Sequence, residues 1–248
     1  MTKVCKAIID FVGCEYELFE RKYEASAVLN RYTGLRQEGK TAGFTPLIII
    51  PSDVLAETLE YFYEDYDVEE SPEGIVKGRE QLLKKIDKVD TEEFLGERLA
   101  EYTDMHEGDD ITGTFIDTEV PDTLSVMQFD GKPYQELIIA KVPTGNPWEL
   151  AVWLPMGGFN DCPGPAEQAA VFRRWYKKYG AVPAVVGYDT WDLTVEKPVT
   201  SDADCETLAK EHFAFSYDNV MQAGEPFDSI RGLASTLRGA AVWGFWWD

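Results

Sequence analysis

Residues 148–162 constrain the fold more than any other stretch of the chain. An apolar run, Leu150–Leu154, ends at Pro155 and is followed by the glycine pair Gly157–Gly158. A short apolar run bounded by turn residues predicts a buried strand, and paired glycines predict a tight turn. An amphipathic pattern that starts near Pro165 predicts a long helix. The stretch therefore predicts a strand, a glycine turn and a helix start in direct succession.

The remaining apolar patterns predict helices and strands that intermix without a strict βαβ rhythm. Helices are predicted at residues 3–12, 25–37, 52–66, 71–86, 90–102, 165–179 and 201–212. Strands are predicted at residues 15–19, 44–50, 134–142, 184–186, 191–195 and 241–248. We expect the strand at residues 134–142 to pair with Leu150–Leu154, and Asp218 and Asp228 to cap two further helices. The patterns predict an α+β fold with a mixed β-sheet flanked by helices.

Charge divides the chain unevenly. The net charge is −22, and residues 51–130 contain 24 Asp and Glu residues but only 6 Lys and Arg residues. We expect residues 1–248 to form a single α+β unit, with an acidic helical excursion and loop at residues 52–130. Such a surface repels nucleic acids and anionic membranes and attracts a basic protein or divalent cations. A purely solubilising acidic face is the alternative.

The cysteines and the N-terminal sequence indicate the compartment. The four cysteines include no CxxC pair, and with only two histidines the chain predicts neither a zinc site nor another cofactor. The N-terminus lacks the apolar core of a signal peptide, and no apolar run approaches the ~18 residues that span a bilayer. We expect a soluble cytoplasmic protein.

A series of spaced motifs in the second half resembles a known family. The series consists of Gly157-Gly158-Phe159-Asn160-Asp161-Cys162-Pro163, Trp175, Tyr179-Gly180-Ala181, Asp189, Leu208-Ala209-Lys210-Glu211, Trp243 and Phe245-Trp246-Trp247-Asp248. Over roughly residues 136–248 it resembles the bacterial family catalogued as domain of unknown function 4253. The resemblance implies no activity, because the family has no assigned function. Members often have Cys-Pro-Asp where this chain has Ser216-Tyr217-Asp218, so a second thiol to act with Cys162 is missing here.

The glycine turn supplies the residues for an enzyme hypothesis, a hydrolase or transferase. Cys162 precedes a helix start, where the macrodipole lowers the pKa of a thiol. His212 as base and Asp189 as its orienting partner complete the catalytic set, provided that folding brings them together. The alternative is structural, with Cys162 packed under the turn and His212 in the core. The turn also offers four binding residues, Gly157, Gly158, Asn160 and Asp161.

The acidic excursion supplies two further hypotheses. Residues 104–122 contain seven acids and no Lys or Arg, but they do not follow the register of an EF-hand, which leaves an irregular cation site. Four acids at and after the end of the helix predicted at residues 52–66 are candidates for contact with a basic partner: Asp65, Asp67, Glu69 and Glu70. The leading hypothesis is a non-catalytic acidic protein-binding module, of which an immunity protein that neutralises a toxin is one form.

Overall fold

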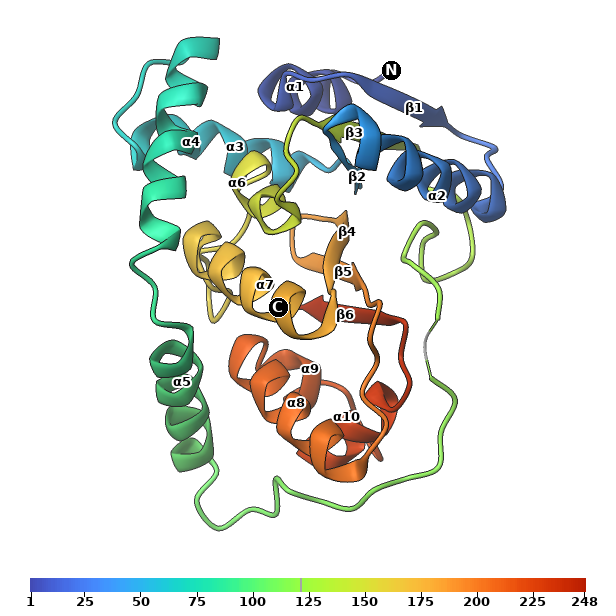
Figure 1. Cartoon of the computed structure of the whole chain (residues 1–248), viewed down its shortest axis with the longest axis vertical. Coiled ribbons are helices and arrows are strands. Elements are labelled where there is room, and N and C mark those ends of the chain that lie inside the picture. Colours follow the sequence, from blue (N-terminus) through green and yellow to red (C-terminus); the bar gives the residue numbers. More distant parts are fainter. Residues whose placement is uncertain (121) are drawn as a thin grey trace.

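The computed structural model describes residues 1–120 and 122–248, and its centre is one mixed six-stranded sheet (Figure 1). The strand order is β1-β3-β2-β4-β5-β6, in which only the β2–β4 pair is parallel. The strands are β1 (Tyr16–Glu20), β2 (Thr45–Ile49), β3 (Glu136–Val142), β4 (Val182–Val186), β5 (Thr190–Thr194) and β6 (Val242–Trp246). The predicted α+β fold is confirmed.

Helices cover both faces of this sheet. They are α1 (Lys3–Val12), α2 (Ala25–Ala42), α3 (Asp53–Asp65), α4 (Pro72–Ile86), α5 (Thr91–Met105), α6 (Leu150–Trp153), α7 (Pro165–Tyr179), α8 (Asp202–Phe215), α9 (Asp218–Met221) and α10 (Ile230–Leu237), with a 3₁₀ turn η1 (Pro147–Glu149). Alternate residues of β2 point to opposite faces. Ile48 packs with α2, whereas Leu47 and Ile49 pack with the larger helical layer. No helix within the described residues is long and apolar enough to cross a membrane.

The predicted strand at Leu150–Leu154 is wrong. The residues form η1 and α6, a helical connection whose side chains Leu150, Ala151 and Val152 are buried. A short apolar run indicates burial but does not distinguish a strand from a buried helical turn. Pairing with β3 is also impossible, because β1 and β2 occupy both edges of that strand. The run is apolar because it packs against α7 and η1.

Other boundaries differ by smaller amounts. Helix α2 continues five residues beyond the predicted end at residue 37, because Gly39 lies inside it against Phe44 and only Gly43 adopts the left-handed conformation that ends it. The predicted caps of the two late helices are also shifted. Tyr217 precedes α9, and Ser229 rather than Asp228 caps α10.

Helices α3, α4 and α5 connect β2 to β3 and form the acidic excursion along one side of the molecule (Figure 1). Their N-caps are the residues expected from the sequence: the side chains of Ser52, Ser71 and Asp90 each accept a backbone N–H. The buried guanidinium of Arg79 in α4 joins the excursion to α1 and α6. Its Nη2 lies 2.9 Å from the carbonyl oxygen of Phe11 and 3.3 Å from that of Trp153.

The C-terminal region encloses an aromatic core. Trp175 lies near its centre, stacked on Phe245 at a ring-centroid distance of 5.2 Å and edge-to-face with Trp243 at 5.8 Å. Trp243, Phe245 and Trp247 are at most 2% exposed. These three side chains of the terminal strand face one way, as the alternation in the sequence predicts, and they close the core beneath α7 and α8.

Candidate functional site

The glycine turn at residues 157–162 is closed around a side chain of the protein itself. The buried amide Nε2 of Gln168 donates to the carbonyl oxygens of Met156 (3.0 Å) and Pro163 (2.8 Å). Its Oε1 accepts the indole N–H of Trp191 at 2.8 Å. A Cβ on Gly157 would lie 2.3 Å from both Gln168 Nε2 and the Pro163 oxygen. Gly157 is therefore required for packing, because the Gln168 amide fills the space inside the turn.

Cys162 lies in this closed turn, and the expectation of a lowered thiol pKa is wrong. The side chain is 4% exposed, and its sulfur accepts a long contact of 3.6 Å from Gln168 Nε2. Burial raises the pKa of the thiol well above its ordinary value, and the nearby Asp189 carboxylate adds to this effect. Helix α7 begins three residues later, so the favourable end of its dipole does not offset the loss of hydration.

His212 lies apart from this turn, inside the aromatic core. Its ring centroid is 4.9 Å from that of Trp175, 4.8 Å from that of Trp243 and 4.7 Å from that of Phe245. Its Nε2 has no hydrogen-bond partner within residues 1–120 and 122–248. Burial lowers the pKa of the imidazole to about 3, so the ring is neutral at physiological pH and out of reach of solvent.

Asp189 lies in the turn between β4 and β5, near the end of β6. Its Oδ2 accepts the indole N–H of Trp246 at 3.2 Å, and its carbonyl oxygen accepts the backbone N–H of Trp247 at 3.1 Å. Burial raises the pKa of the carboxyl group. The structure thus brings Asp189 near Cys162. It does not bring His212 into hydrogen-bonding contact with either residue within the part of the chain it describes.

The other three binding residues of the turn form hydrogen bonds within the turn and to neighbouring segments. The side-chain amide of Asn160 donates to the Asp248 carbonyl oxygen. The Asp161 carbonyl oxygen accepts from Arg98, whose Nε also donates to the Ala214 carbonyl oxygen at 2.7 Å. Gly158, the remaining member, donates its N–H to the Cys162 carbonyl oxygen at 3.1 Å. These groups hold the turn against α5 and the C-terminal strand.

The segment Ser216-Tyr217-Asp218 lies along the free edge of β6 and forms hydrogen bonds to its backbone. Ser216 Oγ donates to the Trp246 carbonyl oxygen at 2.7 Å, and Asp218 Oδ2 accepts the Asp248 N–H at 2.8 Å. The next residue, Asn219, accepts the Trp246 N–H at 3.0 Å through its side-chain oxygen. An edge strand presents unpaired backbone groups, and these side chains satisfy several of them. The sequence offered no signal for this role, because it depends on which strand lies at the edge.

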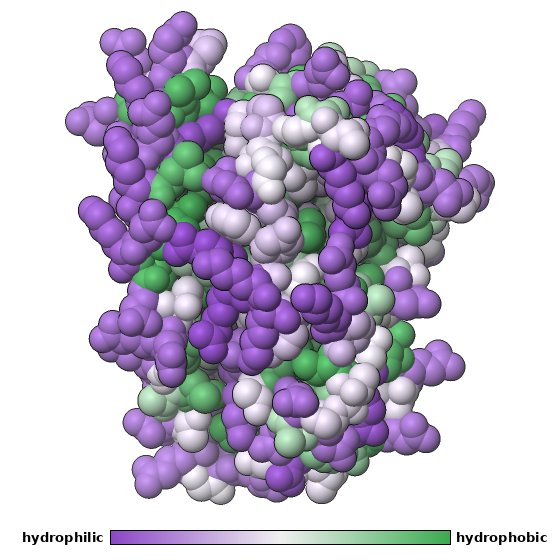
Figure 2. All heavy atoms as spheres, viewed as in Figure 1, coloured by the Kyte–Doolittle hydropathy of each residue, from purple (hydrophilic) through white to green (hydrophobic). Residues whose placement is uncertain are grey.

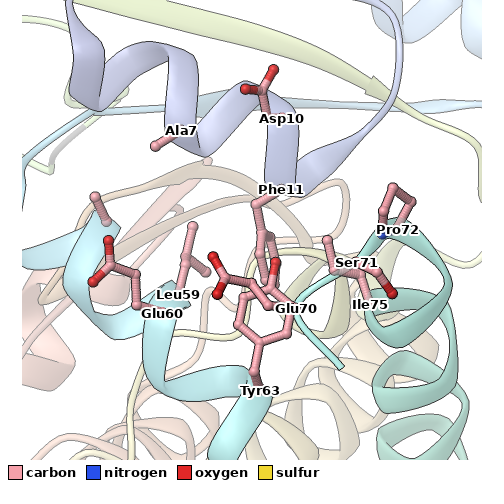
Figure 3. Close-up of a pocket in the computed structure, with 11 residues that line it drawn as sticks. Ala7, Asp10, Phe11, Leu59, Glu60, Tyr63, Glu70, Ser71, Pro72 and Ile75 are labelled. Atoms are coloured by element: carbon pink, nitrogen blue, oxygen red, sulfur yellow. The ribbon is translucent and has the colours of Figure 1, made fainter. Parts of the chain in front are cut away.

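The four acids of the partner hypothesis lie at the end of α3 and in the loop before α4. Asp65, Asp67, Glu69 and Glu70 are all exposed, and none forms an ion pair with another described residue. Glu70 is the member that contributes to a concave surface. It lies beside a groove of about 320 Å³ between α1, α3 and the start of α4 (Figure 3).

This acid-rimmed groove has an apolar floor. Phe11, Leu59 and Ile75 are buried beneath it, whereas Glu60 and Glu70 are exposed at its rim. Figure 3 shows the two rim carboxylates on the same side of the groove as the Tyr63 ring, with Asp10 above on α1. Burial and the Glu70 charge raise the pKa of the Tyr63 phenol. Sequence reasoning identified Glu70 but missed the other groove residues, because α1 and α3 are separated by 40 residues of chain.

The acidic loop at residues 104–122 gives the cation hypothesis no added support. No group of three or more His, Cys, Asp or Glu side chains arranged to hold a metal occurs in residues 1–120 or 122–248. His106 instead joins the loop to the C-terminal region, with its Nε2 2.7 Å from the Tyr217 hydroxyl. The Ile111 carbonyl oxygen accepts the Ile230 N–H at 2.8 Å.

Comparison with known protein families gives a match for the second half of the chain. Residues 138–248 match the model of the family described as Domain of unknown function (DUF4253). The match extends from β3 to β6 and contains the glycine turn and the aromatic core, whereas the acid-rimmed groove precedes it. No curated protein matches the chain, and no solved structure matches it.

Proposed function

We propose that this chain, whose C-terminal region belongs to the DUF4253 family, is a non-catalytic acidic module that binds a basic protein through residues 52–130. The observation that carries the proposal is the acid-rimmed groove, where an apolar floor and unpaired carboxylates are combined. Charge alone would also fit a solubilising face. A groove that presents both kinds of surface to one ligand favours recognition.

The groove suits a Lys or Arg side chain of the partner. Such a side chain has an apolar stem and a charged end, and it buries the stem on apolar surface when the end reaches a polar group. Phe11 and Leu59 provide that surface, and Glu60 provides a carboxylate at the rim. Glu60 and Glu70 form no ion pair within the described part of the chain, so their charges are available.

The two helices α3 and α4, which contribute residues to the groove, also expose apolar side chains. Helices α3 and α4 expose four large apolar side chains to solvent: Val54, Tyr61, Val76 and Leu83. Aromatic and aliphatic residues surrounded by charge are typical of protein-binding surfaces. The partner is therefore expected to contribute apolar contacts in addition to basic side chains.

Neutralisation of a basic toxin, as an immunity protein performs it, is the form of this function that we favour. It requires a stable acidic surface and no catalytic group, and the residues of the glycine turn are engaged in packing. We place the protein in the cytoplasm, because all four cysteines are free, as a reducing compartment favours.

The proposal can be tested with a synthetic peptide in which Lys and Leu alternate, titrated by fluorescence anisotropy. We expect the double variant Glu60→Lys, Glu70→Lys to weaken peptide binding at least about tenfold, because two rim charges are reversed. The matched control is Glu97→Lys, Glu101→Lys, which makes the same charge change on exposed positions of α5.

The control variant distinguishes specific binding at the groove from attraction to the net charge of the protein. We expect it to weaken binding by less than about threefold, since exposed distant charges are screened beyond a Debye length of ~8 Å at physiological salt. Equal losses in the two variants would mean that the peptide responds only to net charge, and the groove would then have no recognition role.

A further inference from the structure

A second groove, which is lined by basic rather than acidic residues, lies between α7 and the start of α5. Its volume is about 510 Å³, and it is lined by four bases of α7 together with Val89, Thr91 and Ala170. The bases are Arg173, Arg174, Lys177 and Lys178. They recur at the spacing that brings residues of successive helical turns to one side. Figure 2 shows hydrophilic side chains gathered over α7 in the middle of the molecule.

Two carboxylates hold these bases in place without neutralising all of them. Glu211 Oε1 lies 3.0 Å from Arg174 Nη2 and 3.9 Å from Lys178 Nζ, while its Oε2 accepts the indole N–H of Trp175 at 2.7 Å. Asp87 pairs with Arg173 at 2.6 Å. The aromatic core therefore fixes Glu211, and Glu211 in turn positions the cations at the groove.

The groove retains an excess of positive charge. Asp87 and Glu211 carry two negative charges against the four positive charges of the bases, and Lys177 forms no ion pair with any residue in the described ranges. Guanidinium and ammonium groups both bind the oxygens of a phosphoryl group, and a lysine without an ion-pair partner contributes a full point charge. We infer that the groove on α7 binds a small phosphorylated ligand.

The charge of the whole protein limits the size of this ligand. A macromolecular polyanion would extend over the acidic surface of a chain with a net charge of −22, and like charges would repel it. A small anion reaches the groove and interacts mainly with the nearest charges, because salt screens the more distant ones. The site is separate from the acid-rimmed groove and does not depend on the function proposed for it.

The inference is tested by titrating inorganic pyrophosphate into the full chain by isothermal titration calorimetry, in a phosphate-free buffer. Since a charge-assisted contact is lost in each case, we expect Lys177→Ala and Arg173→Ala each to weaken binding roughly fivefold to tenfold. Lys3→Ala, which removes an exposed charge from α1, is the matched control and should change the affinity less than about twofold.

Two further titrations define the ligand class. Tighter binding of ATP than of pyrophosphate, with the same sensitivity to Lys177→Ala, would support a nucleotide as the ligand, and tighter pyrophosphate binding would support a smaller phosphate. Absence of pyrophosphate binding at millimolar concentration would overturn the inference. So would unchanged affinity in both groove variants, or equally tight binding of polyglutamate that Lys177→Ala also weakens.

Discussion

The glycine turn at residues 157–162 and the acid-rimmed groove differ in what occupies them. The Gln168 amide fills the space inside the turn and satisfies carbonyl groups on both sides of it. The groove between α1, α3 and α4 is open, and the carboxylates of Glu60 and Glu70 at its rim have no partner in the described residues. A glycine pair before a helix is a frequent feature of binding sites, but here it serves packing. The open surface is made by helices that the sequence places far apart.

The same contrast extends to how the two regions are stabilised. The C-terminal region is held by aromatic rings in mutual contact around Trp175. The acidic excursion packs on α1 through the rings of Phe62 and Phe11, and the buried guanidinium of Arg79 adds hydrogen bonds to α1 and α6. Variants of each region should therefore differ in both the size and the extent of their effects.

The largest effect is expected in the aromatic core. Replacing the fully buried Trp175 with Ala should lower the free energy of unfolding by about 3–5 kcal/mol, because it removes a large apolar side chain and leaves a cavity. Urea denaturation measures this change. The neighbouring Tyr176 is 37% exposed, so Tyr176→Ala should cost less than about 1 kcal/mol. Similar losses in the two variants would show that the core is not the main source of stability.

Arg79→Ala should produce the next largest loss, about 3 kcal/mol, because buried carbonyl groups at the ends of α1 and α6 lose their donor. Burial lowers the pKa of this guanidinium to about 10, which reflects the cost of enclosing a charge that has no carboxylate partner within residues 1–120 and 122–248. Lys77→Ala, at an exposed position of the same helix, should change stability by less than about 0.5 kcal/mol.

Hydrogen exchange would localise the effect of Arg79→Ala. We expect faster exchange in α1 and α4 than in β4 and β5, because the guanidinium extends from α4 and donates to carbonyl groups at the end of α1. A uniform increase in exchange over all elements would indicate that the excursion and the C-terminal region unfold together.

A pair of glycine variants tests whether the turn is built for packing. Gly157→Ala should cost about 2–3 kcal/mol, because φ is +104° and the new Cβ would overlap Gln168 Nε2 and the Pro163 oxygen. Gly158→Ala has a similar backbone conformation with φ +77° but open space around the Cβ, so it should cost about 1 kcal/mol. Thermal or urea unfolding compares the two. Equal costs would mean that backbone conformation alone explains both glycines.

The sequence predicted most elements because their signals are local. The caps at Ser52, Ser71 and Asp90 and the apolar faces behind them need no knowledge of the fold. The failure at Leu150–Leu154 has a non-local cause. Whether a short buried run becomes a strand depends on whether a sheet edge is free, and β3 has none.

The candidate sites were less predictable for the same reason. The sequence drew attention to Glu70, but the groove also needs Phe11 from α1 and Leu59 from α3. Burial raises the thiol pKa of Cys162, although its position before a helix predicted a lowered value. The sequence pattern does not indicate that Gln168 packs against this thiol. The basic groove on α7 also needs Val89 and Thr91, which lie far from α7 in the sequence. Arg173 pairs with Asp87 of the acidic excursion.

The smallest predicted effect is a pH dependence of the free energy of unfolding that His212 in the buried core causes. Burial lowers the pKa of His212 to about 3, while an unfolded histidine titrates near its ordinary value of 6.5. Between these values the unfolded chain binds the proton more readily, so stability is lost as the pH falls below about 6.5.

Between about pH 7.5 and pH 5.5 this difference should lower the free energy of unfolding by about 1.4 kcal/mol. The variant His212→Leu cannot be protonated at this position and should lack that part of the pH dependence. Urea denaturation of both proteins at the two pH values measures the difference between them. The exposed acids of the excursion are present in both proteins, so their contribution cancels in the comparison. If the two proteins lose stability equally, the imidazole is hydrated or protonated in the folded state, and the aromatic core is more open than its packing indicates.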